Sequence, residues 1–414
     1  MAIVKPFQCV RPEEATAHLV AALPYDVYNR KEACEITASN PKSFLNIDRP
    51  ETQFSDDVDT YDSRVYEKAR ELLNAWISDG TLIKDSKKAY YIYELIMDGR
   101  GQTGIVACSS IDDYAQGIIK KHENTREEKE LDRICHVDRT DAQTGPIFLA
   151  YRSKEAINGI VARVIGTKPL YDFTAEDGVS HKIWQVIDEK TVGEIEEAFV
   201  RVPATYIADG HHRAASAVKV GCKRREENPG YTGEEPFNYF LSVLFPDEQL
   251  MIMPYNRVVK DLNGLSEEEY LKKVEETFLV EALGEEACSP IQKATFGMYL
   301  NKKWYRLTIK DSYLSKDPVK GLDVSLLQDR LLDPVLGVKD PRVDKRVDFI
   351  GGIRGLKELE KRCSEDMTVA FSMYPTSIEE LFQVADAGLL MPPKSTWFEP
   401  KLRSGLFIHP LSAI

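Results

Sequence analysis

The most informative stretch of the sequence is Pro203-Ala-Thr-Tyr-Ile-Ala-Asp-Gly-His-His-Arg-Ala-Ala-Ser-Ala217. Residues 205–208 are β-prone and predict a short strand. Asp209-Gly210 is a typical turn, and the alanine-rich segment from Arg213 onward favours a helix. The stretch therefore predicts a strand, a tight turn and a helix in immediate succession.

The residues after this turn carry groups that suit a phosphate. His211, His212 and Arg213 lie at the expected helix N-terminus, where free backbone N–H groups and the helix dipole attract anions. Arg213 adds a forked donor that matches phosphate geometry. Asp209 could orient a histidine or hold a metal ion, and Gly210 could let the phosphate approach the backbone. The alternative is a capped turn with two surface histidines.

A second junction is Gly117-Ile-Ile-Lys-Lys-His-Glu-Asn-Thr-Arg-Glu-Glu128. Thr125 and the glutamate three residues later have the spacing of a capping box, which predicts a helix from Arg126. His122 and Thr125 are then candidate phosphate contacts, and Glu123 is a candidate general base or metal ligand. Arg126 excludes the HExxH zinc motif. The alternative is a solvated charged face.

A third junction is Val347-Asp-Phe-Ile-Gly-Gly-Ile-Arg-Gly355, which predicts a strand, a glycine pair and a helix. Glycines let a backbone approach a ligand closely, so Gly351, Gly352 and Arg354 are candidate nucleotide contacts. The segment matches neither the P-loop nor the GxGxxG pattern. A tight turn is the alternative.

Two segments nearer the chain ends add weaker candidates. Lys394-Ser395-Thr396 follows two prolines and could hold phosphate, although a stiff loop would look the same. Asp26 and Ser43 lie in turn-like segments near the N-terminus and are candidate substrate contacts.

The composition limits the classes of function. The chain has 414 residues and a formal net charge of −13, which argues against a protein whose main function is to bind nucleic acid or an anionic membrane. It has no apolar run of membrane-spanning or signal-peptide length. Its seven cysteines are scattered and form no CxxC pair, so we expect reduced thiols, a cytoplasmic protein and no cysteine-based zinc site.

Helical and strand patterns are mixed without regular βαβ alternation, which predicts an α+β (mixed α/β) fold. The clearest expected elements are a helix over 62–78, a hairpin that turns at Asp98-Gly99, capped helices that follow Ser266 and Ser377, and a hairpin over 296–309. We place a loose domain boundary near 255–265. This divides the chain into 1–260, the N-terminal and central catalytic region, and 261–414, a C-terminal region that contributes loops to the same site.

Taken in order, the motifs resemble those of the domain-of-unknown-function family numbered 1015, over essentially the whole chain. The motifs that carry this resemblance are Pro24-Tyr25-Asp26, His122-Glu123-x-Thr125, Asp209-Gly210-His211-His212-Arg213, Gly351-Gly352-Ile353-Arg354-Gly355 and Pro392-Pro393-Lys394-Ser395-Thr396. The third motif also resembles the phosphate turn of the ParB/sulfiredoxin-like fold, which the free serine kinases share.

This resemblance implies a ParB/sulfiredoxin-like central domain and a kinase that phosphorylates a small hydroxyl compound, with free L-serine as the best guess. It implies a nucleotide (ADP or ATP) or pyrophosphate as donor, and Mg²⁺ as cofactor. Glu123 is then the expected base, Asp209 its alternative, and His211 and His212 the donors to the transferred group. The expected partners are the small-molecule substrate and the phosphate donor, and a homodimer is left open.

Two other classes of function stay open on the sequence alone. A ParB-like nucleotide-binding regulator or DNA-binding protein would share the phosphate turn but needs a basic surface. A metal-dependent hydrolase would need His122, Glu123, Asp209, His211 and His212 to meet around one ion.

Overall fold

The computed structural model describes residues 1–412 and divides them into two compact units. The first unit comprises residues 1–250 together with the C-terminal segment from Pro400, and the second comprises 251–399. The second unit thus begins ten residues before the expected division at 260/261, and the C-terminal segment returns to the first unit. Helices and strands are mixed in both units, which confirms the α+β fold class. None of the helices formed by residues 1–412 has the length and hydropathy needed to cross a bilayer.

The helices and strands of the first unit are β1 (Val4–Lys5), β2 (Val10–Pro12), α1 (Ala17–Val20), α2 (Arg30–Ser39), α3 (Leu45–Asp48), α4 (Ser63–Ser78), β3 (Leu82–Lys84), β4 (Tyr90–Met97), β5 (Arg100–Ser110), α5 (Ile111–Ala115), β6 (Ile119–Lys120), α6 (Glu127–Thr140), β7 (Ala142–Gln143), β8 (Ile147–Tyr151), α7 (Glu155–Ile165), β9 (Tyr171–Thr174), β10 (Ser180–Val186), α8 (Glu189–Val200), β11 (Thr205–Asp209), α9 (His211–Glu227), β12 (Tyr239–Pro246) and β21 (His409–Pro410). Those of the second unit are β13 (Ile252–Met253), β14 (Tyr255–Val259), α10 (Glu267–Thr277), β15 (Phe278–Gly284), β16 (Thr295–Leu300), β17 (Lys303–Ile309), α11 (Asp323–Leu327), β18 (Val347–Gly351), α12 (Leu356–Glu365), β19 (Val369–Met373), α13 (Ile378–Asp386) and β20 (Trp397–Phe398).

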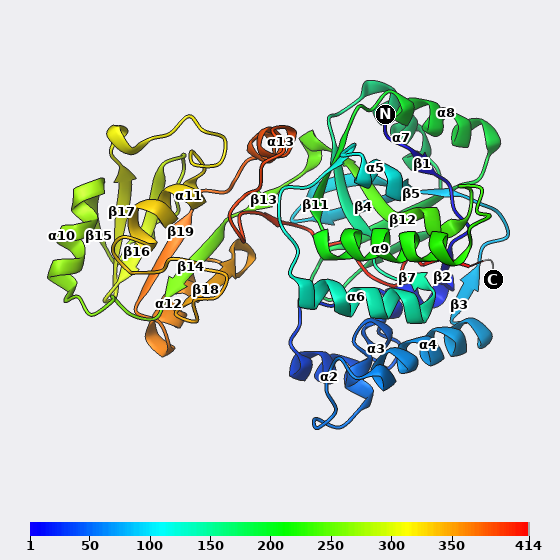
Figure 1. The fold of residues 1–414 in the computed structure, drawn as a ribbon, viewed down its shortest axis with the longest axis horizontal. Helices are drawn as coiled ribbons and strands as arrows, with labels where there is room; N and C mark the ends of the chain where they lie inside the picture. The colour runs from blue at the N-terminus through cyan, green and yellow to red at the C-terminus, as the bar shows by residue number, and fades with distance from the viewer. Residues whose placement is uncertain (413–414) are drawn as a thin grey trace. The chain divides into compact units, whose positions relative to one another are not determined.

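A mixed sheet forms the centre of the first unit. Its strands follow the order β6-β11-β8-β12-β5-β4-β10-β9, and β1 pairs with β5. The pairs β6–β11 and β8–β12 are parallel, and the other pairs are antiparallel. Buried side chains from α5, α7, α8 and α9 pack with those of the strands in one apolar cluster. Figure 1 shows α6 beside α9, and both helices belong to this unit.

The C-terminal segment is anchored to the first unit by aromatic packing and strand pairing. The ring of Phe407 lies 5.3 Å from that of Tyr91 and 5.6 Å from that of Tyr93. Ile408 pairs with Val10, and β21 pairs with β7. These contacts fix the position of residues 400–411, which becomes important for the candidate site.

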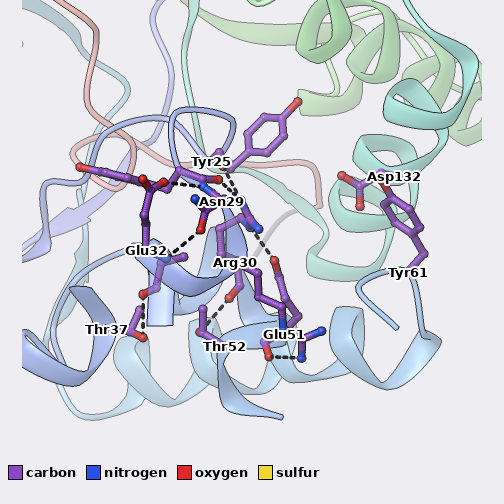
Figure 2. A network of polar contacts seen from close by, with 12 residues as sticks. Tyr25, Asn29, Arg30, Glu32, Thr37, Glu51, Thr52, Tyr61 and Asp132 are labelled. Atoms are coloured by element: carbon purple, nitrogen blue, oxygen red, sulfur yellow. Dashed lines mark hydrogen bonds and ion pairs between the residues drawn. The ribbon is translucent and has the colours of Figure 1, made fainter. Parts of the chain in front are cut away.

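The N-terminal helices of the first unit are tied together by polar contacts (Figure 2). Asn29 and Glu32 form a capping box at the start of α2. Arg30 donates to the backbone carbonyls of Val58 and Glu51. Arg49 donates to the backbone carbonyl of Tyr25 at 2.9 Å, which holds the loop before α2 against the helices that follow it.

The second unit contains a six-stranded sheet in the order β15-β17-β16-β19-β14-β18, in which every pair is antiparallel. Both capping boxes expected here are present, one at Ser266 before α10 and one at Ser377 before α13. The expected hairpin over 296–309 is formed by β16 and β17. In the first unit, α4 matches the helix expected over 62–78, and β4 and β5 form the hairpin at Asp98-Gly99.

Candidate functional site

The turn between β11 and α9 is the centre of the candidate site. Gly210 is the N-cap of α9 and has a left-handed backbone with φ +92°. Gly210 has no side chain that could cap this helix end, and the carboxyl of Asp209 accepts a hydrogen bond from the backbone N–H of Gly210. A Cβ on Gly210 would lie 3.0 Å from Nε of Arg213, so the glycine lets the guanidinium fold back over the turn.

Asp209 is enclosed by two cations. Its Oδ2 accepts from Nη2 of Arg213 at 3.3 Å and lies 3.7 Å from Nζ of Lys401. Burial alone would raise the pKa of the Asp209 carboxyl, but Lys401 and Arg213 together hold it well below its usual range. Asp209 is therefore ionised at neutral pH and is a weak proton acceptor. Arg213 also donates to the backbone carbonyl of Pro146.

The first and second sequence junctions meet in the structure. The short strand β6 runs parallel to β11, with Ile119 opposite Thr205, so the residues that follow the two strands emerge at the same sheet edge. The rings of His122 and His211 consequently pack edge to face with centroids 4.6 Å apart. One ligand-type atom from each of His122, Glu123 and His211 lies within 4.8 Å of the other two.

The two histidines of this group are buried and neutral. Burial lowers the pKa of His122 from 6.5 to about 4. Burial and the neighbouring His122 hold the pKa of His211 well below its usual range. Nε2 of His211 is buried and has no hydrogen-bond partner among residues 1–412. His211 therefore presents a polar atom whose bonding capacity the rest of the described chain does not use.

The predicted capping box at Thr125 and Glu128 is wrong. Helix α6 begins at Glu127, and Arg126 is its N-cap without a side-chain cap. The hydroxyl of Thr125 instead donates to Oε2 of Glu130 at 2.6 Å. The backbone N–H of Arg126 donates to Nε2 of His212 at 3.0 Å. A hydrogen bond to His212 of α9 thus takes the place of the local capping box. His212 lies close to Arg126 in space, although it is far from Arg126 along the chain.

His212 therefore has a structural contact that the sequence did not predict. Its Nε2 accepts from the second junction, and its backbone carbonyl accepts from the hydroxyl of Ser216 within α9. His212 links the starts of α6 and α9, whereas His211 turns toward His122. The adjacent histidines consequently have different surroundings.

The glycine pair of the third junction lies in the second unit, where packing explains it. A Cβ on Gly351 would lie 2.7 Å from the ring of Trp397, and one on Gly352 would lie 2.8 Å from Pro254. Arg354 is largely exposed and lies 3.9 Å from Glu358. The role of Gly351, Gly352 and Arg354 as nucleotide contacts stays a prediction.

The Lys394-Ser395-Thr396 segment also lies in the second unit. Lys394 has a left-handed backbone and places its Nζ 5.6 Å from the centre of the Tyr255 ring. The hydroxyl of Ser395 donates to the carbonyl of Pro392 at 2.6 Å, which closes a turn. Phosphate binding by these residues stays a prediction.

The two N-terminal candidates, Asp26 and Ser43, lie in the first unit. Asp26 is exposed. Ser43 is buried, and its Oγ accepts from the backbone N–H of Leu45 at 3.4 Å, as in a local turn. A substrate role for either residue stays a prediction.

Sequence reasoning missed Lys401 and a small cavity beside Arg213. The cavity has a volume of about 30 Å³, room for about two water molecules. Its lining includes Arg213, Asp48 and Arg133. Arg133 stacks on the ring of Tyr25 at 3.9 Å. Residues 392–414 contain three basic residues and one acidic residue, and this positive balance was the sequence signal for Lys401, whereas the cavity had none.

Comparison with known proteins gives distant structural relatives. The fold resembles SbnI with a C-terminal truncation from Staphylococcus aureus, with 10% identity, a TM-score of 0.39, and coverage of 72% of this chain and 85% of that one. It also resembles a free serine kinase in complex with AMP, with 14% identity, a TM-score of 0.33, and coverage of 72% and 91%. A conserved hypothetical protein from Pyrococcus furiosus matches with 14% identity, a TM-score of 0.33, and coverage of 73% and 94%. Likeness at this level assigns no activity.

No curated protein matches the sequence. The family described as "Protein of unknown function (DUF1015)" matches residues 4–325, which is most of the chain and includes the whole β11–α9 junction. The chain belongs to the DUF1015 family.

Proposed function

We propose that this protein is a small-molecule phosphotransferase that moves a phosphoryl group from a nucleotide or pyrophosphate to a hydroxyl, with free L-serine as the first acceptor to test. The observation that carries the proposal is the uncapped start of α9, where Gly210 precedes His211, His212 and Arg213. A helix end of this kind favours anions through the backbone N–H groups of its first turn and its dipole. Arg213 supplies a fixed positive charge at the same place.

Phosphoryl transfer depends mainly on positioning and on neutralising charge. Arg213 and Lys401 bring two positive charges to one turn, and Asp209 supplies a single negative charge between them. Both cations therefore lie beside the start of α9, where a phosphate would bind. In this proposal Asp209 is a positioning residue that holds the two cations near the start of α9.

Glu123 is the residue that we propose as general base. It is half-buried and lies beside His122 and His211, next to the start of α9. Asp209 is the weaker choice because its two cations stabilise the ionised carboxylate and lower its pKa. In the step, Glu123 takes the proton of the substrate hydroxyl, and the hydroxyl oxygen forms a bond to phosphorus. The bond from phosphorus to the leaving phosphate oxygen breaks at the same time.

Mg²⁺ is the expected companion of a nucleotide donor, and it would supply charge neutralisation of the phosphates when bound. Glu123 offers an oxygen ligand of the kind that this ion prefers. Asp209 fits this role poorly, because Arg213 and Lys401 already neutralise its carboxylate.

The most basic run in the sequence lends no support to a nucleic-acid surface. Lys223 and Arg224 both pair with Asp138, at 2.6 and 3.1 Å. Arg225 forms a bidentate ion pair with Asp112, with hydrogen bonds of 2.7 and 2.8 Å. The run is therefore largely neutralised within its own unit, which favours a small phosphate ligand over a polyanion.

The test is product formation by the full chain. Purified protein is incubated with Mg²⁺, L-serine and either ADP, ATP or pyrophosphate, and O-phosphoserine is measured by mass spectrometry. We expect product with at least one donor, and we expect Glu123→Gln to lower turnover by about 10²–10⁴-fold, as removal of a general base does. Glu128→Gln is the matched control, because Glu128 is an exposed residue in the first turn of α6. A screen of donors and amino acids without any phosphorylated product would refute the proposal.

A further inference from the structure

We infer that His122, Glu123 and His211 bind one divalent transition-metal ion, of the class of Mn²⁺, Fe²⁺, Co²⁺ or Zn²⁺. The inference goes beyond phosphoryl transfer, because it concerns an ion that the chain would hold whether or not a nucleotide is bound. It starts from the grouping of two imidazole nitrogens and one carboxylate oxygen within 4.8 Å of one another. Two strand ends, those of β6 and β11, bring these residues together.

The second observation is the unused nitrogen of His211. The residue is only 7% exposed, and Nε2 has no hydrogen-bond partner among residues 1–412. Burying such an atom without a partner is unfavourable, and native structures rarely do it without a reason. A metal ion beside His122 and Glu123 would give this nitrogen its missing bond.

The placement of both histidines suits metal binding. Both rings are buried and pack edge to face, so the surrounding structure fixes their positions beside Glu123. His122 also makes a hydrogen bond with the backbone of Ile207. Metal-binding histidines commonly use one ring nitrogen in this way, which fixes the orientation of the ring.

The donor set selects the class of ion. Two histidines and one carboxylate are typical of zinc, iron and similar ions, whereas Mg²⁺ prefers oxygen ligands alone. Ligand atoms about 2.1 Å from an ion lie roughly 3–4 Å apart, and the three candidate atoms lie within 4.8 Å of one another, so at most a small inward movement of the side chains brings them to bonding distance. Three protein ligands leave positions for water or for a phosphate oxygen. A carboxylate that binds through one oxygen also leaves the other oxygen of Glu123 to accept a proton.

Two of the five residues that the sequence offered as metal ligands make other contacts in the structure. His212 uses Nε2 to accept from the backbone of Arg126, and Asp209 is paired with Arg213 and Lys401. Both are therefore occupied by other contacts. Asp209 still adds negative charge near His122 and His211, and Lys121 adds positive charge near His211.

The experiment uses the full chain, treated with a chelator and then titrated with Co²⁺ or Zn²⁺. Bound metal is counted by mass spectrometry after dialysis, and Co²⁺ binding is followed by its visible absorption. We expect one ion per chain, retained in the presence of millimolar Mg²⁺. We expect His211→Ala to weaken binding by more than about 100-fold, since even residues outside the ligand shell contribute 10–100-fold. His18→Ala, which removes an exposed histidine elsewhere in the same unit, should bind like the parent chain.

A substitution at Glu123 controls for loss of folding as the cause of weaker metal binding, because Glu123 is only half-buried. Glu123→Gln keeps the size of the side chain and is expected to weaken Co²⁺ binding and to reduce the metal-induced rise in melting temperature. No binding at a ratio of one ion per chain, or binding that survives both His211→Ala and Glu123→Gln, would overturn the inference. The readout is metal binding, so its failure is distinct from a failure to form phosphorylated product.

Discussion

Replacing Gly210 by alanine perturbs the backbone turn and the arginine that folds over it. Gly210 has φ +92°, where a residue with a Cβ is strained by about 1–2 kcal/mol. The new Cβ would also lie 3.0–3.1 Å from the guanidinium of Arg213. Displacing that group weakens its bonds to Asp209 and to the carbonyl of Pro146. Loss of one such charged hydrogen bond adds about 1.5–3 kcal/mol, so Gly210→Ala should cost about 2.5–5 kcal/mol.

A second glycine separates these two contributions. Gly117 has φ +73° and nothing within 4 Å of its added Cβ, so Gly117→Ala should cost only the backbone strain of about 1–2 kcal/mol. Hydrogen exchange on peptides from β8 and β12 reports the free energy of unfolding of the first unit for both variants. Phosphoryl transfer should be lost in Gly210→Ala and kept in Gly117→Ala. Equal destabilisation by the two substitutions would refute the argument that Gly210 is needed for the position of Arg213.

Three further predictions follow from single contacts. Because the pKa of His122 falls from 6.5 to about 4 on folding, stability of the first unit should drop as the pH is lowered from about 6.5 toward 4, and His122→Gln should flatten that slope in pH-dependent hydrogen exchange. Lys401→Met should raise the pKa of Asp209, measured by carboxyl NMR titration, because it removes the largest favourable charge acting on that carboxylate. Gly351→Ala should destabilise the second unit by about 1–3 kcal/mol, seen as faster exchange in β18, because its Cβ would lie 2.7 Å from the Trp397 ring.

The sequence correctly predicted the helices, strands and turns that depend on interactions between residues close together in the chain. The strand, turn and helix around Asp209-Gly210 follow from β-prone residues, a turn pair and an alanine-rich segment, and the structure forms β11 and α9 there. The boxes at Ser266 and Ser377 formed because their partners lie three residues away. In these cases the interacting residues are near neighbours in the sequence, so the sequence alone was enough to predict the structure.

The wrong or missing predictions concern contacts that are distant in sequence. The box at Thr125 fails because Glu130 takes its hydroxyl and His212 takes the backbone N–H of Arg126. Lys401 reaches Asp209 only because the C-terminal segment returns to the first unit. The pairing of His122 with His211 depends on the parallel alignment of β6 with β11, which no spacing in the sequence encodes.

A crystal structure of the full chain grown with ADP and L-serine would test the phosphate site directly. We expect a phosphate at the start of α9, within hydrogen-bond distance of the backbone N–H groups that follow Gly210 and of the Arg213 guanidinium. We also expect the serine hydroxyl next to Glu123. A nucleotide whose phosphates lie away from this turn, with the start of α9 empty, would show that the β11–α9 turn does not bind the phosphoryl donor.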